Sequence, residues 1–102
     1  MSKKTNKLFQ FAISKNINNI IDINNRYKEY GYKLYLVDNS IEIIYNKSIY
    51  SVEVIQNKDE FYWCLMYRKK NLVKTKITDS FEIIIQTIYK NEKLYQKEGF
   101  YE

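Results

Sequence analysis

The hydrophobic and polar residues of this chain follow two different periods. Up to about residue 30, apolar side chains return every three or four positions with Lys, Asn and Asp between them, and the recurring residues are Phe9, Ile13, Ile17, Ile20 and Tyr27. Such spacing puts them on one face of a helix, so residues 3–30 are predicted to be helical. Ser and Asn favour caps over helix interiors, which leaves two shorter helices, broken near Ser14 to Asn16, as an alternative.

Beyond Gly31 the period changes from helical to alternating, and short polar clusters interrupt it at regular intervals. Gly31 tolerates the left-handed conformation that closes a helix. The clusters divide the next segment into five predicted strands, which are Tyr32–Val37, Ser40–Tyr45, Ser48–Ile55, Glu60–Arg68 and Leu72–Ile77. Each connection is too short for a parallel crossover, so the predicted sheet, over residues 32–77, is an antiparallel meander.

The lengths of the connections set the predicted register, because a slip by one residue turns every side chain to the opposite face. Two-residue loops at 38–39 and 46–47, a four-residue loop at 56–59 and a three-residue loop at 69–71 send the large apolar side chains to one face. The resulting neighbours are Tyr32 with Tyr45, Leu36 with Ile41, Ile43 with Tyr50, Val52 with Trp63, and Trp63 with Ile77. Trp63 is therefore predicted to lie at the centre of the core.

A second helix is predicted over residues 80–95, followed by a tail over residues 96–102. Asp79 can cap its first amide groups while Glu82 reaches back in a capping box. The chain is thus predicted to form a single α+β domain over residues 1–102. An N-terminal helix, a five-stranded antiparallel meander sheet and a C-terminal helix follow one another, with both helices on one face of the sheet.

The opposite face of the sheet is then left to solvent or to a partner, and it is more apolar than a solvated face requires. Aromatic and Met side chains within a basic rim are typical of protein interfaces. The predicted partner-binding residues on this face are Lys33, Tyr35, Ile44, Tyr62, Met66, Arg68, Lys74 and Lys76. Alternatively, Tyr and Ile serve there only as good strand formers, or the first helix or the tail covers them.

The composition argues against an enzyme, because the chain has no His, a single Cys and only two glycines. Without His, a nucleophile lacks its usual general base and a metal lacks its commonest ligand. We therefore predict no catalytic residue, no bound metal and no cofactor, and interpret Cys64 as an ordinary strand residue. A lone Cys fits a reducing cytoplasm. No apolar run is long enough for a signal peptide or a membrane span, so we expect neither secretion nor membrane insertion.

Charge and residue usage narrow the class of partner only in part. The net charge of +5 has the wrong sign for a mimic of DNA. Basic charge can attract nucleic acids or acidic proteins, or it can serve only solubility. The abundance of Ile, Asn, Lys and Tyr indicates an AT-rich genome, such as that of a low-GC bacterium, its phages or its plasmids.

Three functions fit these observations. The first is a small cytoplasmic protein-binding module of a phage or other mobile element, which inhibits by occluding a macromolecular partner, for example as an anti-CRISPR protein. The second is a binder of RNA or single-stranded DNA, in which Tyr35 and Tyr62 stack on bases while Lys74 and Lys76 contact phosphates. The third is a homodimer whose open sheet face or edge pairs with its copy.

Overall fold

The structure, a computed structural model, describes residues 7–97, with side chains described up to residue 94. The elements are helix α1 (Lys7–Tyr27), the short 3-10 helix η1 (Lys28–Tyr30), strands β1 (Lys33–Val37), β2 (Ser40–Tyr45), β3 (Ser48–Asn57), β4 (Glu60–Tyr67) and β5 (Lys70–Lys76), and helix α2 (Glu82–Lys97). This order confirms the predicted α+β arrangement of helix, five strands and helix. Predicted helical residues 3–6 and residues 98–102 of the predicted tail lie outside the described residues. The prediction that the tail begins at residue 96 is wrong, because α2 continues to Lys97.

A single helix spans residues 7–27, so the alternative with a break near Ser14 to Asn16 is wrong. The Ser14 hydroxyl donates a hydrogen bond to the Phe11 carbonyl at 3.1 Å, and the Asn16 amide donates to the Ala12 carbonyl at 3.2 Å. These bonds turn both polar side chains back onto the helix, where they do not cap a new one. Gly31, at φ 95°, closes η1 in the left-handed conformation, as predicted.

The five strands lie in the order β1-β2-β3-β4-β5, and every neighbouring pair is antiparallel. The predicted register of the first three strands is confirmed, because Leu36 opposes Ile41 and Ile43 opposes Tyr50. The predicted two-residue turns at 38–39 and 46–47 are therefore confirmed.

The predicted register between β3 and β4 is wrong by two residues. Val52 opposes Leu65 in place of Trp63, because β3 continues to Asn57 and leaves only a two-residue turn before β4. Lys58 permits that tight turn by adopting a φ of 58°. A shift of two residues keeps every side chain on its own face, so the predicted core is unchanged.

The predicted pairing of β4 with β5 is also wrong, since Trp63 opposes Thr75 in place of Ile77. A two-residue turn at residues 68–69 replaces the predicted three-residue loop, and β5 begins two residues earlier than expected. A register irregularity halfway along the pair takes up the odd residue. Such a bulge restores the alternation, and Thr75 is buried as a result.

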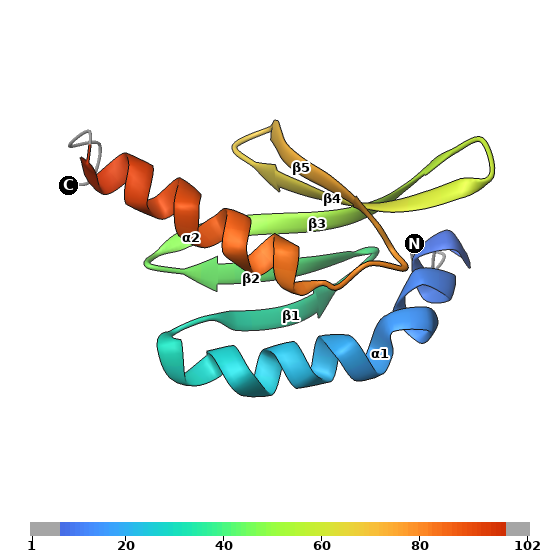
Figure 1. Cartoon of the computed structure of the whole chain (residues 1–102), viewed down its shortest axis with the longest axis horizontal. Helices are drawn as coiled ribbons and strands as arrows, with labels where there is room; N and C mark the ends of the chain where they lie inside the picture. The colour runs from blue at the N-terminus through green and yellow to red at the C-terminus, as the bar shows by residue number, and fades with distance from the viewer. Residues whose placement is uncertain (1–6, 98–102) are drawn as a thin grey trace.

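Both helices cover the same face of the sheet. Figure 1 shows α2 lying across the sheet and α1 running beside β1. Buried side chains of both helices pack in one cluster with Ile41, Ile43, Val52 and Leu65 of the strands. Trp63 is fully buried in this cluster, as predicted, and its ring meets that of Phe81 edge-on at a centroid distance of 5.5 Å. Neither helix of residues 7–97 has the length and hydropathy needed to cross a membrane.

The hairpin turns use no glycine, although several of their residues have left-handed backbones. Positive φ values occur at Asp38, Asn46, Lys47, Lys58, Arg68 and Lys69. Asn and Asp tolerate this region, whereas for other side chains it costs about 1–2 kcal/mol per residue. The turns at 46–47 and 68–69 have two such residues in succession, which matches the twist of the flanking strands. Strand pairing therefore has to outweigh the conformational free energy that these left-handed residues cost.

Replacing Lys47 by Gly is expected to stabilise the protein. The variant Lys47→Gly creates an Asn-Gly pair, which this turn favours, and removes the Cβ clash at φ 68°. After the entropy cost of glycine, the free energy of unfolding should rise by about 0.5–1 kcal/mol in urea titrations. In contrast, Lys90→Gly within α2 should lower it by about 1 kcal/mol. A decrease for Lys47→Gly would show that the turn is not strained.

Candidate functional site

The face of the sheet opposite the helices has most of the predicted partner-binding residues, and the register places them side by side. Lys33 opposes Ile44 on β2, and Tyr62 opposes Lys76 on β5. On this face Lys33, Tyr35, Lys74 and Lys76 are exposed, while Ile44, Tyr62 and Met66 are half-buried. We call this surface the reverse face.

Arg68 is the predicted residue that the structure separates from the others. It lies in the turn after β4, with a φ of 51°. Its guanidinium lies over the ring of Tyr67, 5.2 Å from the centroid, and Tyr67 belongs to the buried cluster on the helix-covered side. The turn thus carries Arg68 away from the alternating pattern that placed it on the reverse face.

The β4–β5 half of the reverse face has a compact group of paired charges. The Glu60 carboxylate accepts a hydrogen bond from the Tyr62 hydroxyl at 3.0 Å and forms an ion pair with Lys76 at 3.1 Å. The Lys74 ammonium lies 5.3 Å from the centroid of the Tyr62 ring. The hydrogen bond from Lys76, followed by that from Tyr62, lowers the pKa of Glu60, while Glu60 raises the pKa of Lys76.

This pairing changes the expected electrostatics of the reverse face. Lys76 is compensated by Glu60, and one side of the Tyr62 ring is occupied by Lys74. Glu42 and Glu53 belong to the same face, because they oppose Tyr35 and Cys64 in the register. The face therefore alternates in charge, which favours a protein partner over the uniform phosphates of a nucleic acid.

The β1–β3 half of the reverse face is more apolar. Ile44 opposes Ile49 across the β2–β3 turn, and Ile49 is 57% exposed. Tyr35 of β1, diagonally across from Ile44, is exposed, and so is Val37 farther along the strand. Ile49 was missing from the predicted site although the predicted two-residue turn at 46–47 already places it opposite Ile44. The alternation of the sequence was the signal that could have found it.

Cys64 lies on the reverse face but is poorly accessible, at 5% exposure. Its sulfur is 3.5 Å from the sulfur of Met66, two residues along the same strand. Burial, together with the charge of Glu53, raises the pKa of the thiol. A protonated, buried thiol is a poor nucleophile, which agrees with its interpretation as a strand residue.

A cleft that the sequence did not predict lies between the two helices. It has a volume of about 870 Å³, and its aromatic lining comes from α1, η1, β2, α2 and the residue before β1, as Tyr27, Tyr30, Tyr45, Tyr89 and Tyr32 respectively. The rings of Tyr32 and Tyr45 stack at 4.0 Å with an interplanar angle of 3°, and Tyr27 meets Tyr32 edge-on at 5.7 Å. We call this hollow the tyrosine cleft.

The tyrosine cleft offers ring faces and phenol hydroxyls. Tyr32 is buried, and this burial, with the nearby Tyr45 phenol, raises its pKa. Arg26, at the cleft wall, is engaged by carboxylates of both helices. Hydroxyl groups and aromatic faces suit non-covalent binding of a flat or extended group.

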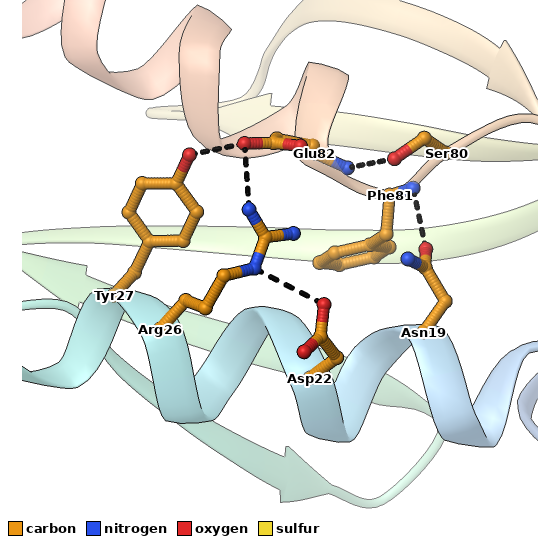
Figure 2. Close-up of polar contacts among 7 residues, drawn as sticks. All are labelled: Asn19, Asp22, Arg26, Tyr27, Ser80, Phe81 and Glu82. Carbon is orange, nitrogen blue, oxygen red and sulfur yellow. Dashed lines mark hydrogen bonds and ion pairs between the residues drawn. The ribbon is translucent and has the colours of Figure 1, made fainter.

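Two residues that line the cleft, Arg26 and Tyr27, also join α1 to the start of α2 (Figure 2). Glu82 accepts a hydrogen bond from the Tyr27 hydroxyl and forms an ion pair with Arg26 at 3.3 Å. Arg26 also contacts Asp22, one turn earlier on α1, at 3.1 Å. The bond from Tyr27, joined by the charge of Arg26, lowers the pKa of Glu82.

The same junction corrects the predicted start of α2, which is Glu82 and not residue 80. The Ser80 hydroxyl, and not Asp79, accepts the hydrogen bond from the Glu82 amide, at 3.1 Å. The Asn19 side chain of α1 accepts one from the Phe81 amide, at 2.8 Å. A capping box requires Glu82 to reach back along its own chain, but the phenol and guanidinium of α1 attract it instead.

A buried carboxylate, that of Glu92 on α2, contacts Tyr50 of β3. It is 1% exposed and accepts a hydrogen bond from the Tyr50 hydroxyl, while the Asn91 amide donates to that hydroxyl at 2.9 Å. The other Glu92 oxygen, Oε1, has no hydrogen-bond partner among the described residues. Burial, then the bond to Glu92, raises the pKa of Tyr50. The pair is enclosed, so we assign it a structural role.

The chain is not similar to a known protein in any of three comparisons. No protein-family model matches it, and no curated protein and no solved structure matches it. In the described part of the chain, no cluster of three or more Cys, Asp or Glu side chains could hold a metal ion. The candidate interaction surfaces of the described residues are therefore the reverse face, the sheet edges and the tyrosine cleft.

The junction at Glu82 predicts a specific dependence of stability on pH. The folded-state pKa of Glu82 lies below its ordinary value of 4.5, so its carboxylate stabilises the fold above that value. This stabilisation should be lost as the pH falls through the lowered pKa. The stability advantage of the wild type over Glu82→Gln, measured by urea unfolding from about pH 7 to about pH 3, should therefore shrink in acid.

A matched control for that experiment is Glu29→Gln. Glu29 is an exposed carboxylate of η1 near the same cleft. Its replacement should leave the pH profile close to that of the wild type. Parallel profiles for wild type and Glu82→Gln would mean that the junction does not hold an ionised carboxylate.

The buried pair of Tyr50 and Glu92 predicts strong coupling between two substitutions. Tyr50→Phe removes the donor and leaves a buried carboxylate without a partner, which should lower the free energy of unfolding by about 1–3 kcal/mol. The double variant Tyr50→Phe/Glu92→Met removes both polar groups and should be more stable than Tyr50→Phe alone. If the double variant lost as much free energy of unfolding in urea titrations as Tyr50→Phe and Glu92→Met lose together, the assigned pairing would be contradicted.

Proposed function

We propose that this protein is a non-catalytic binding module that docks a folded protein partner on its reverse face. The observation that carries the proposal is the group of apolar side chains around the Ile44–Ile49 pair. Tyr35 and Met66 belong to the same face, and within residues 7–97 the helices pack on the other side of the sheet. Exposed apolar groups with a polar rim are typical of protein interfaces.

The mode of action we propose is occlusion. The reverse face is part of a sheet whose opposite side is fixed by a continuous buried core, so it presents a preformed surface. Preformed surfaces bind without a large ordering cost, and a bound module covers what lies beneath it. We propose that such covering inhibits the partner.

The biological setting we propose is a phage or other mobile element of a low-GC bacterium, with inhibition of a host defence nuclease, such as a CRISPR effector, as one instance in the cytoplasm. The support for this setting is the AT-rich residue usage and the net charge of +5, which suits an acidic protein or a nucleoprotein. Binding of nucleic acid by the face itself is less favoured, because Lys76 is paired with Glu60 and Glu42 and Glu53 stand on the same surface.

A capture experiment with matched variants tests this proposal. Tagged wild-type protein should retain a stoichiometric protein from a nuclease-treated lysate of its host, because the contact does not need nucleic acid. Ile49→Glu places a charge in the apolar centre and should weaken binding of that purified partner at least tenfold, about 1.4 kcal/mol.

The control for Ile49→Glu is Leu94→Glu. Leu94 is exposed to a similar extent, 52%, but lies on α2, away from the reverse face. Leu94→Glu should bind like the wild type. The proposal would be overturned if no stoichiometric protein is retained, if nuclease treatment removes it, or if Ile49→Glu binds as tightly as the control.

A further inference from the structure

The two edges of the sheet are built differently. β5 carries Lys70, Lys74 and Lys76, and a bulge interrupts its pairing with β4. Lysines and bulges are the features that prevent edge strands from pairing with other chains. By contrast, β1 pairs regularly with β2 and has no charged residue between Lys33 and Asp38. The edge at β1 therefore lacks the protection that the edge at β5 has.

The backbone of β1 has hydrogen-bonding groups directed away from the sheet. Opposite residues of an antiparallel pair alternate between hydrogen-bonded and non-hydrogen-bonded, and the pair that closes the two-residue turn, Val37 with Ser40, is of the first kind. Leu34 and Leu36 then fall at the second kind, so their N–H and C=O groups point outward. Along residues 7–97, no backbone hydrogen bond joins either residue to a further element.

Apolar side chains flank this edge on both faces of the sheet. On the helix side, Leu36 is 62% exposed and lies with Ile17 and Ile21 along a groove of about 170 Å³ between α1 and β1. On the reverse face, Tyr35 and Val37 are exposed. Figure 1 shows α1 running beside β1, so helix and strand together border the groove. Backbone groups and apolar surface thus coincide at one edge, as strand addition requires.

We propose that β1 pairs antiparallel with β1 of a second copy of this chain, about a two-fold axis that passes through Tyr35. Two five-stranded sheets then form one continuous sheet. In this register Leu34 of each copy opposes Leu36 of the other, and both residues use their outward N–H and C=O groups. The two Tyr35 side chains meet on the reverse face, at the axis.

The occupant is a second copy because the edge is complementary to itself. Its hydrogen-bonding residues lie symmetrically about Tyr35, as a two-fold contact requires. Lys33 of each copy opposes Val37 of the other, so no like charges face each other across the paired edges. Leu34 of the second copy extends the apolar floor beside Ile17 and Ile21. The proposal does not rest on the function of the reverse face.

The mass of the protein in solution tests the dimer. Sedimentation equilibrium should give twice the chain mass for the wild type at micromolar concentration, and also for Leu94→Lys, an exposed control on α2. Leu36→Lys adds a charge to the edge and should sediment as a folded monomer, with the far-ultraviolet circular dichroism of the wild type. A monomeric wild type, or a dimer that persists in Leu36→Lys, would overturn the proposal.

Cross-linking tests the register independently of the charge variant. Opposed residues at a non-hydrogen-bonded position lie about 4.5 Å apart between Cα atoms, within the range of a disulfide. In a Cys64→Ser background, Tyr35→Cys should therefore form covalent dimers under mild oxidation. Val37→Cys opposes Lys33 of the second copy and not its own counterpart, so it should not. Equal cross-linking of the two variants, or none with Tyr35→Cys, would contradict the two-fold pairing.

Discussion

The contact between the rings of Trp63 and Phe81 joins the middle of the sheet to the start of α2, and the other features of the fold follow from it. Phe81 is held in place because its amide donates to Asn19 of α1, while the next residue, Glu82, accepts from Tyr27. Both helices are thereby fixed to the same side of the sheet. Because they are joined at this point, they border the tyrosine cleft farther along.

The helices cover only one face of the sheet, so the side chains on the reverse face need other partners or solvent. The two halves of the reverse face differ in this respect. On β4 and β5, tyrosine and lysine side chains are paired with Glu60, so this half is a solvated surface with internal partners. The apolar side chains around Ile44 and Ile49 are not part of these polar pairs. The adjoining β1 edge has outward backbone groups as well, so the interaction potential of the molecule is concentrated toward its first strands.

The sequence was sufficient for the element order and for the partition of side chains between the two faces. Apolar alternation determines which face a residue takes, and errors of two residues, as at Val52 and Trp63, leave that choice intact. It was insufficient for turn lengths, because Lys58, Arg68 and Lys69 adopt left-handed backbones that local propensity does not favour. Tertiary pairing imposes those conformations.

The candidate sites were predictable to different degrees for the same reason. Tyr35 and Ile44 could be placed from strand period alone, whereas Arg68 could not, since it lies in a turn. The tyrosine cleft depends on how the helices cross the sheet. Only the opposition of Tyr32 and Tyr45 was visible in the register, and Tyr89 joins them through the packing of α2. Likewise, Glu82 follows a capping pattern, but its partners come from a distant helix.

The meander also bears on how the chain reaches its native state. Each strand pairs with its neighbour in the sequence across a two-residue connection, so little chain entropy is lost before the first ladders form. The bonds from Asn19 and Tyr27 to the start of α2 are different, because they close segments of 62 and 55 residues. Bringing the start of α2 to α1 across these long segments, and not assembly of the hairpins, is then the step of folding that costs the most chain entropy.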